Sequence, residues 1–214
     1  MKVELQRVAP ADIEARSMEI ITQELGERQF PAEQLPIIKR VIHTSADFDY
    51  ADNLRFSEGV VEQGVAAIRG GCTVVTDTQM AWSGVNKRVL ERFGGKAVCF
   101  MSDPDVAAEA KARGVTRAAV SMERAAALEG PVIFALGNAP TALVRVCELI
   151  DEGKLAPALV IGAPVGFVNV VESKELLLRT DVPSITACGR KGGSNVAAAI
   201  CNALLYLASG NVRE

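Results

Sequence analysis

Histidine is almost absent from this chain: His43 is the only one among its 214 residues. A single imidazole leaves no second histidine for a metal cluster or for a paired acid–base system. If the protein does proton chemistry near neutral pH, His43 is the natural candidate, because only imidazole has an unperturbed pKa in that range. The alternative interpretation is a histidine near a helix C-terminus, where the helix dipole favours a positive charge.

The chain also lacks an excess of basic residues. Its 23 Lys and Arg stand against 26 Asp and Glu, giving a net charge of −3. This balance argues against a general nucleic-acid binder, which needs positive charge to contact phosphates. No apolar stretch is long enough to span a bilayer, so we expect no membrane partner. Residues 1–5 carry an acid early and have no apolar signal core, so we expect no secretory signal.

Closely spaced cysteine pairs are missing as well. The chain has five cysteines, an odd number, and no two of them form a CxxC pair. Most lie within apolar runs, which is typical of reduced thiols that serve as small core residues. We therefore expect a cytoplasmic protein. The five are Cys72, Cys99, Cys147, Cys188 and Cys201.

Aromatic residues make up 5% of the chain, whereas hydrophobic residues as a whole make up 49%. Small aliphatic side chains must therefore fill the core, as in α/β proteins with a parallel sheet. Five short apolar runs end in Gly, Asp or Ser, as expected of strands buried on both faces. These predicted strands are residues 73–76, 97–100, 132–136, 158–161 and 184–187.

Helical periodicity fills the remaining segments. We expect helices at 10–25, from Pro36 through His43, at 57–68, 85–93, 104–113, 141–152, 170–179 and 195–208. Residues 118–120 are ambiguous between a short strand and part of a helix. Strands that alternate with helices predict an α/β fold: a single three-layer domain over residues 1–214, with a mainly parallel, doubly wound sheet preceded by N-terminal helices. Arg40 and His43 are three residues apart and therefore share a helix face.

Ligands of open parallel sheets bind beyond the carboxyl ends of the strands. The segments in that position are 77–80, 101–104, 137–141, 162–167 and 189–195. Several lead directly into helices, whose N-termini offer unpaired N–H groups and favour anions. Arg190 and Lys191 add cationic donors to this set. The loops together predict a ligand with several carboxylates or phosphates.

Each of these signals also has a purely structural interpretation. Residues 137–141 are a good helix start, because Asn caps helices and Pro suits the first turn. Residues 189–194 lack the spacing of either phosphate-loop motif, so a nucleotide site is not expected. Asp77 is suited to cap the following helix. Ser17 lies in an apolar helical stripe and either bonds back to the preceding turn or faces a ligand.

Six segments of the chain, taken in order, form a recognisable set of motifs: 16–21 (RSMEII), 40–47 (RVIHTSAD), 76–78 (TDT), 137–143 (GNAPTAL), 164–168 (PVGFV) and 189–194 (GRKGGS). Together they resemble the precorrin-8X methylmutases of cobalamin biosynthesis. The resemblance covers about residues 13–207.

The resemblance implies a homodimeric isomerase with sites built partly at the subunit interface. Family members move a methyl group from C11 to C12 of precorrin-8X, giving hydrogenobyrinate, or act on the cobalt-containing analogue, giving cobyrinate. This rearrangement needs no cofactor and no metal supplied by the protein. The resemblance assigns His43 as proton donor and acceptor and matches Ser17 and Arg40 to substrate-contacting positions.

The remaining predicted contacts to the substrate carboxylates are our own inference from the strand-end loops. They are Asp77, Asn138, Pro164, Gly166, Arg190, Lys191, Gly192 and Gly193. We also hypothesise that Asp47 orients the His43 imidazole or raises its pKa. The alternative function is a non-catalytic corrinoid or tetrapyrrole carrier, which would keep the anion-binding loops but would not need His43.

Overall fold

A six-stranded sheet lies at the centre of the computed structural model, which describes residues 6–210. The strand order is β1-β6-β5-β4-β2-β3. Strands β2 to β6 pair in parallel, and β1 pairs antiparallel with β6 at the edge. This confirms the predicted mainly parallel sheet. The strands are β1 (Leu54–Phe56), β2 (Thr73–Thr76), β3 (Lys96–Val98), β4 (Val132–Leu136), β5 (Leu159–Gly162) and β6 (Ser184–Ala187).

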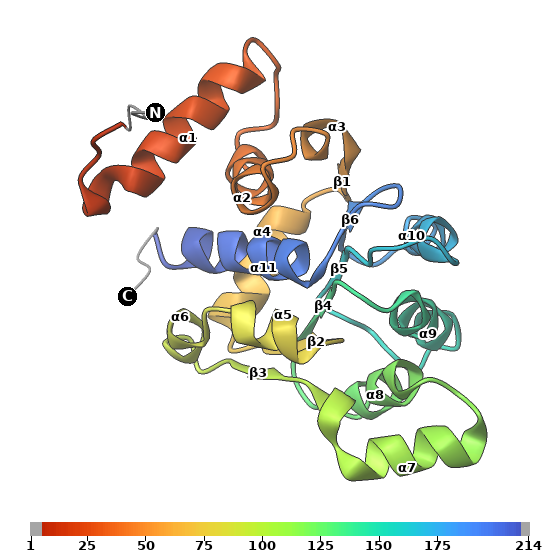
Figure 1. The fold of residues 1–214 in the computed structure, drawn as a ribbon. Helices are drawn as coiled ribbons and strands as arrows, with labels where there is room; N and C mark the ends of the chain where they lie inside the picture. The colour runs from red at the N-terminus through yellow and green to blue at the C-terminus, as the bar shows by residue number, and fades with distance from the viewer. Residues whose placement is uncertain (1–5, 211–214) are drawn as a thin grey trace, which may run out of the picture.

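Helices cover both faces of the sheet (Figure 1). One layer holds α7 to α10, and the other holds α2, α4, α5, α6 and α11; α1 lies outside this layer and packs against α2. The helices are η1 (Pro10–Asp12), α1 (Ile13–Leu25), α2 (Leu35–Ser45), α3 (Tyr50–Asn53), α4 (Val60–Arg69), α5 (Gln79–Gly84), α6 (Lys87–Glu91), η2 (Phe100–Ser102), α7 (Pro104–Arg113), α8 (Arg117–Ala125), α9 (Pro140–Asp151), α10 (Val170–Leu177) and α11 (Ser194–Ala208).

Two main apolar cores, one on each side of the sheet, explain the nearly continuous apolar strands. Along β4, Ile133 and Ala135 face the core under α11, and Phe134 and Leu136 face the core under α8 and α9. Alternate residues of a strand point to opposite faces, so a strand between two helix layers must be apolar throughout. The predicted strands match β2 to β6 to within two residues.

Four short elements were missed by the sequence analysis: β1, α3, α5 and η2. β1 has three residues with the exposed Arg55 at its centre, so it carries no apolar run. The ambiguous residues 118–120 lie in α8. The third predicted helix begins at Val60 rather than Ser57, because the Ser57 hydroxyl accepts a hydrogen bond from the N–H of Ser184, the first residue of β6.

The adjacent strands β2 and β4 form the topological switch point of the sheet, because the chain leaves them in opposite directions. Such crevices commonly hold ligands. Here the fully buried Asp77 fills it: its carboxylate accepts hydrogen bonds from the N–H groups of Gly137, Asn138 and Ala139 at 2.9, 2.7 and 2.6 Å. Burial raises the pKa of the Asp77 carboxyl, and these hydrogen bonds act in the opposite direction. The residue that caps α5 is Thr78, not Asp77.

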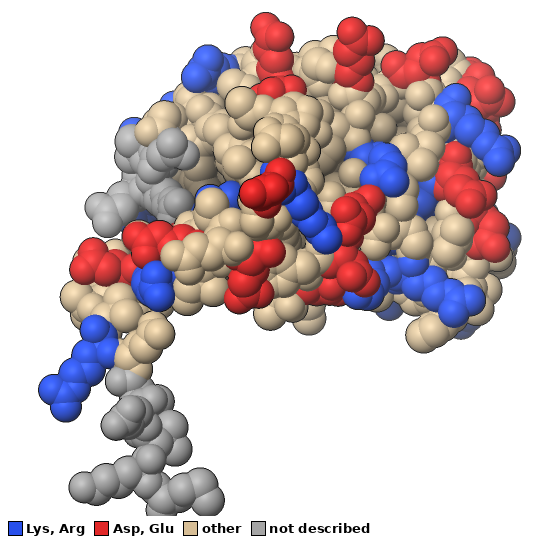
Figure 2. Space-filling view, turned by 90° about the horizontal axis from the view of Figure 1, so that it is seen from above, with Lys and Arg blue, Asp and Glu red and all other residues tan. Residues whose placement is uncertain are grey.

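Basic and acidic side chains are intermingled on the face of the molecule shown in Figure 2. Within residues 6–210, no group of three or more His, Cys, Asp and Glu is placed to hold a metal ion. None of the helices in this part of the chain combines the length and the apolar character that crossing a membrane requires. All five cysteines are free thiols.

We predict that Asp77→Asn lowers the free energy of unfolding by about 3 kcal/mol, because an amide N–H₂ then faces buried backbone N–H groups. Urea denaturation of the wild type and the variant measures the loss. Asp181→Asn, the same change at an exposed position, is the matched control. Equal stability of the two variants would contradict the role of Asp77 as the tie between the loops after β2 and β4.

Candidate functional site

His43 lies in the last turn of α2, and its exposed side chain lines a cavity of about 270 Å³. The structure therefore places His43 at a helix C-terminus and against a cavity, and its role in proton chemistry stays a prediction. Arg40 lines the same cavity, as expected of residues three apart on one helix face. The other lining residues come from α2, α5 and α11 and are Thr44, Gly84, Asn195, Ala198, Ala199, Asn202 and Tyr206.

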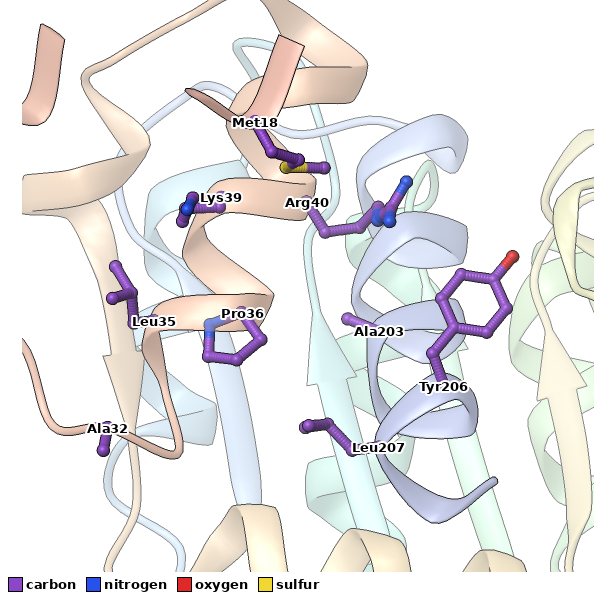
Figure 3. Close-up of a pocket in the computed structure, with 9 residues that line it drawn as sticks. All are labelled: Met18, Ala32, Leu35, Pro36, Lys39, Arg40, Ala203, Tyr206 and Leu207. Atoms are coloured by element: carbon purple, nitrogen blue, oxygen red, sulfur yellow. The ribbon is translucent and has the colours of Figure 1, made fainter. Parts of the chain in front are cut away.

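Arg40 is held by two neighbours. Its guanidinium forms an ion pair with Glu14 of α1 and lies over the ring of Tyr206, 5.5 Å from the centroid. Figure 3 shows Arg40 extending from α2 toward Tyr206 on α11. Arg40 and Tyr206 also line a second cavity of about 300 Å³, bordered by apolar residues such as Met18 and Leu207. Arg40 therefore lies between two neighbouring cavities.

Ser17 behaves as the structural interpretation predicted. Its hydroxyl donates a hydrogen bond to the Ile13 carbonyl oxygen, 2.9 Å away and one turn earlier in α1. This bond satisfies the hydroxyl within its own helix. Ser17 lines neither of the two cavities that Arg40 borders, so a role in contacting substrate stays a prediction.

Asp47 is not paired with the His43 imidazole, contrary to our hypothesis. Its carboxylate accepts a hydrogen bond from Lys191 Nζ at 2.6 Å, and Asp49 accepts another from the same ammonium at 2.7 Å. Lys191 holds the pKa of Asp47 below its usual value. The two aspartates thus tie the loop after β6 to the segment after α2.

The loops after β4, β5 and β6 meet backbone to backbone. Gly193 N–H donates to the Ala163 carbonyl at 2.9 Å, and Gly166 N–H donates to the Arg190 carbonyl at 3.2 Å. A Cβ on Gly192 would collide with the Ala163 and Pro164 carbonyl oxygens, and one on Gly137 would lie 2.5 Å from the Gly193 oxygen. These glycines are required by the close approach of the chains.

Apolar side chains stand exposed beside this group of loops. Phe167 and Val168, which follow β5, are 83% and 78% exposed. The Arg190 guanidinium lies 5.5 Å from the centroid of the Phe167 ring. Exposed apolar side chains next to a cation fit a ligand with an apolar body and acidic side chains.

Most of the predicted site residues thus form two groups, and Ser17, Asn138 and Asp77 lie outside both. His43 and Arg40 share a cavity, whereas Pro164, Gly166, Arg190, Lys191, Gly192 and Gly193 belong to the joined loops. Asn138 is exposed at the start of the loop before α9. Asp77 belongs to neither group, because its carboxylate is buried and bound by backbone N–H groups.

Comparison with known proteins decides the family. The model for Precorrin-8X methylmutase matches residues 12–207. The chain belongs to the precorrin-8X methylmutase family. It is therefore a methylmutase, an isomerase of cobalamin biosynthesis, as the resemblance of its motifs implied.

Individual members of the methylmutase family are similar along nearly their whole length. The cobalt-precorrin-8 methylmutase of Priestia megaterium is 49% identical over 205 residues, which cover 96% of this chain and 91% of that protein. The Salmonella typhimurium protein of the same name is 48% identical, covering 92% and 95%. A crystal structure of the precorrin-8X methylmutase from Thermus thermophilus has a TM-score of 0.86 at 42% identity, covering 94% of this chain and 98% of that one.

Two asparagines on α11 line the cavity of this methylmutase but were not named as candidates: Asn195, the last residue of the predicted ligand-binding segment 189–195, and Asn202. Asn202 is used structurally, because its side chain bonds the Gly84 carbonyl and the Asn86 N–H, each at 2.8 Å. Asn195 is exposed at the first turn of α11, beside Gly193. The two asparagines are seven residues apart in an apolar helix, so their spacing already placed them on one face.

Proposed function

We propose that this methylmutase moves the C11 methyl group of cobalt-precorrin-8 to C12, giving cobyrinate, with His43 as proton donor and acceptor. The observation that carries the proposal is the cavity at which the sole imidazole and the Arg40 guanidinium meet. The cobalt-containing substrate is favoured over the metal-free one because relatives at 49% and 48% identity are cobalt-precorrin-8 methylmutases. We also propose that the protein is located in the cytoplasm.

The migrating methyl group never leaves the substrate, so the enzyme needs no nucleophile. His43 donates a hydrogen bond or a proton to the macrocycle and thereby shifts electron density across the conjugated ring as the C11–methyl bond breaks and the C12–methyl bond forms. The proton returns to His43 in the product. Binding of the peripheral carboxylates fixes the ring against the imidazole, which supplies orientation.

Arg40 is the carboxylate-binding group nearest to His43 along α2. The guanidinium matches a carboxylate with two parallel N–H donors. Because the Arg40 guanidinium is already paired with Glu14, a substrate carboxylate binds it by displacing the Glu14 carboxylate. The loops after β5 and β6, with Arg190, receive further carboxylates, and the exposed Phe167 lies against the apolar part of the macrocycle.

A second copy of the chain completes the site in this proposal. Pockets for drug-sized ligands typically hold about 300–1,000 Å³ and bury about 70–90% of the ligand surface. The cavity at His43 holds about 270 Å³, and a corrin with many carboxylates is larger than such ligands. Met80, Phe167 and Val168 are exposed by 71% or more. A homodimer would cover these exposed apolar side chains and close the site over the macrocycle.

We predict that His43→Ala lowers the turnover number by about 10²- to 10⁴-fold, the usual contribution of general acid–base catalysis. Visible absorption follows conversion of cobalt-precorrin-8 and, in parallel, of precorrin-8X. Product binding is expected to stay within a few-fold of wild type, because His43 is not the main carboxylate ligand. A wild type that binds both substrates and converts neither supports the carrier function instead.

Glu14→Gln is expected to tighten product binding a few-fold, equivalent to about 1 kcal/mol for a partly exposed ion pair. The amide competes less well for Arg40 than the carboxylate does. Spectroscopic titration with cobyrinate at low ionic strength measures the change, and Glu24→Gln at an exposed position of α1 is the matched control. Weaker binding by Glu14→Gln alone would show that Glu14 prepares Arg40 rather than competing for it.

The homodimer predicts a solution mass twice that of one chain. Light scattering after size exclusion measures the mass, and a dilution series of the turnover assay links it to function. Specific activity is expected to fall in the concentration range where the dimer dissociates. A monomer with undiminished activity would mean that one chain contains the whole site.

A further inference from the structure

Lys174 on α10 is an unusual buried residue. Its side chain is 1% exposed, although lysine is rarely buried unless it is paired. Its Nζ donates hydrogen bonds of 2.7 Å to the carbonyl oxygens of Gly189 and Lys191. Both acceptors are backbone atoms of the loop after β6. These hydrogen bonds, rather than an ion pair with a carboxylate, offset the cost of burying the ammonium.

These two bonds constrain the loop that carries Arg190 and Lys191. The carbonyl oxygens of Gly189 and Lys191 are directed to a buried ammonium, so they are not presented to a ligand on the outer side. A carbonyl oxygen facing a carboxylate would repel it, whereas a positive charge behind the loop attracts it. The residue between the two, Arg190, is exposed and lies over Phe167.

We propose that Lys174 is a positioning residue for the polycarboxylate substrate: it turns the carbonyl groups of residues 189 and 191 inward and places a fixed positive charge behind the loop. This inference rests on the proposed function, in which the loop after β6 receives substrate carboxylates. Lys174 itself touches no substrate, because it is covered by α10 and by the loop.

Burial lowers the pKa of Lys174 to about 8, so the charge is present at neutral pH and is lost as the pH rises above that value. α10 packs against α9 and β6. Cys188, directly after β6, is the titratable group within residues 6–210 whose charge acts on Lys174, and burial raises its thiol pKa. The charged residues of α9, the helix packed against α10, are Arg145, Glu148 and Asp151. On the loop itself, Lys191 is held charged by Asp47 and Asp49, which raise its pKa.

The test measures the dissociation constant of the product cobyrinate and the turnover number for Lys174→Met. A unit charge about 10 Å from a carboxylate, at an effective dielectric constant of about 20, predicts an increase in the dissociation constant on the order of tenfold. The turnover number is expected to change less than the dissociation constant, because His43 is untouched. Lys111→Met, which removes an exposed lysine of α7, is the matched control and is expected to leave both values unchanged.

The pH profile gives a readout that a purely structural role would not move. The wild type is expected to bind cobyrinate more weakly as the pH rises through about 8, the value to which burial lowers the Lys174 pKa, and Lys174→Met is expected to lack this step. If the variant does not fold, the wild-type profile alone decides: constant affinity between neutral pH and well above 8 overturns the inference.

Arg190→Gln separates this inference from the proposed function. Weaker cobyrinate binding by Arg190→Gln but not by Lys174→Met supports the carboxylate-binding loop and overturns the role of Lys174. Unchanged binding by Arg190→Gln overturns the loop as a carboxylate site, and with it the premise of the inference. If both variants bind cobyrinate more weakly, and Lys174→Met no longer loses affinity as the pH rises through about 8, the positioning role of Lys174 is supported.

Discussion

The close approach of backbone to backbone at the carboxyl edge of the sheet is the constraint on which the site depends. The loops after β4, β5 and β6 are joined by main-chain hydrogen bonds and leave no room for a Cβ at Gly137 or Gly192. Two buried charged side chains add hydrogen bonds to these main-chain contacts. Asp77 binds the N–H groups of one loop, and Lys174 binds the carbonyl groups of another.

The two buried charges bind opposite ends of the peptide group, the N–H donor and the carbonyl acceptor. A carboxylate accepts from N–H groups and an ammonium donates to carbonyl groups, so each buried charge satisfies groups that water would otherwise have to reach. The switch-point crevice between β2 and β4 is consequently filled by protein. The cavity with His43 lies instead between α2, α5 and α11, to the side of the sheet. The N-terminal helix α2 thus lines the candidate cavity, and α1 contributes Glu14, the ion-pair partner of Arg40.

The local patterns that predict the sheet and the helices are strong because each reflects burial between two layers. Strands β2 to β6 are apolar on both faces, and α11 is apolar almost all round since it lies between the sheet and α2. β1 could not be predicted, because three residues with Arg55 at the centre carry no such pattern. His43 and Arg40 could be placed together from their spacing alone. Asp77 and Lys174 could not be assigned their roles, because their partners lie 60 or more and 15 or more residues away and depend on the finished topology.

Each cation at the candidate site already has a neighbour. Arg40 has Glu14 and Tyr206, Arg190 has Phe167, and Lys191 has Asp47 and Asp49. A ligand with one carboxylate gains little by displacing one such neighbour, because the attraction it gains replaces an attraction that is lost. A rigid ligand with several carboxylates displaces several of these neighbours in one binding event. The loss of translational and rotational freedom is then incurred once, while each carboxylate adds its own contact. In the proposed function, paired cations therefore favour a ligand with several carboxylates over a ligand with a single carboxylate.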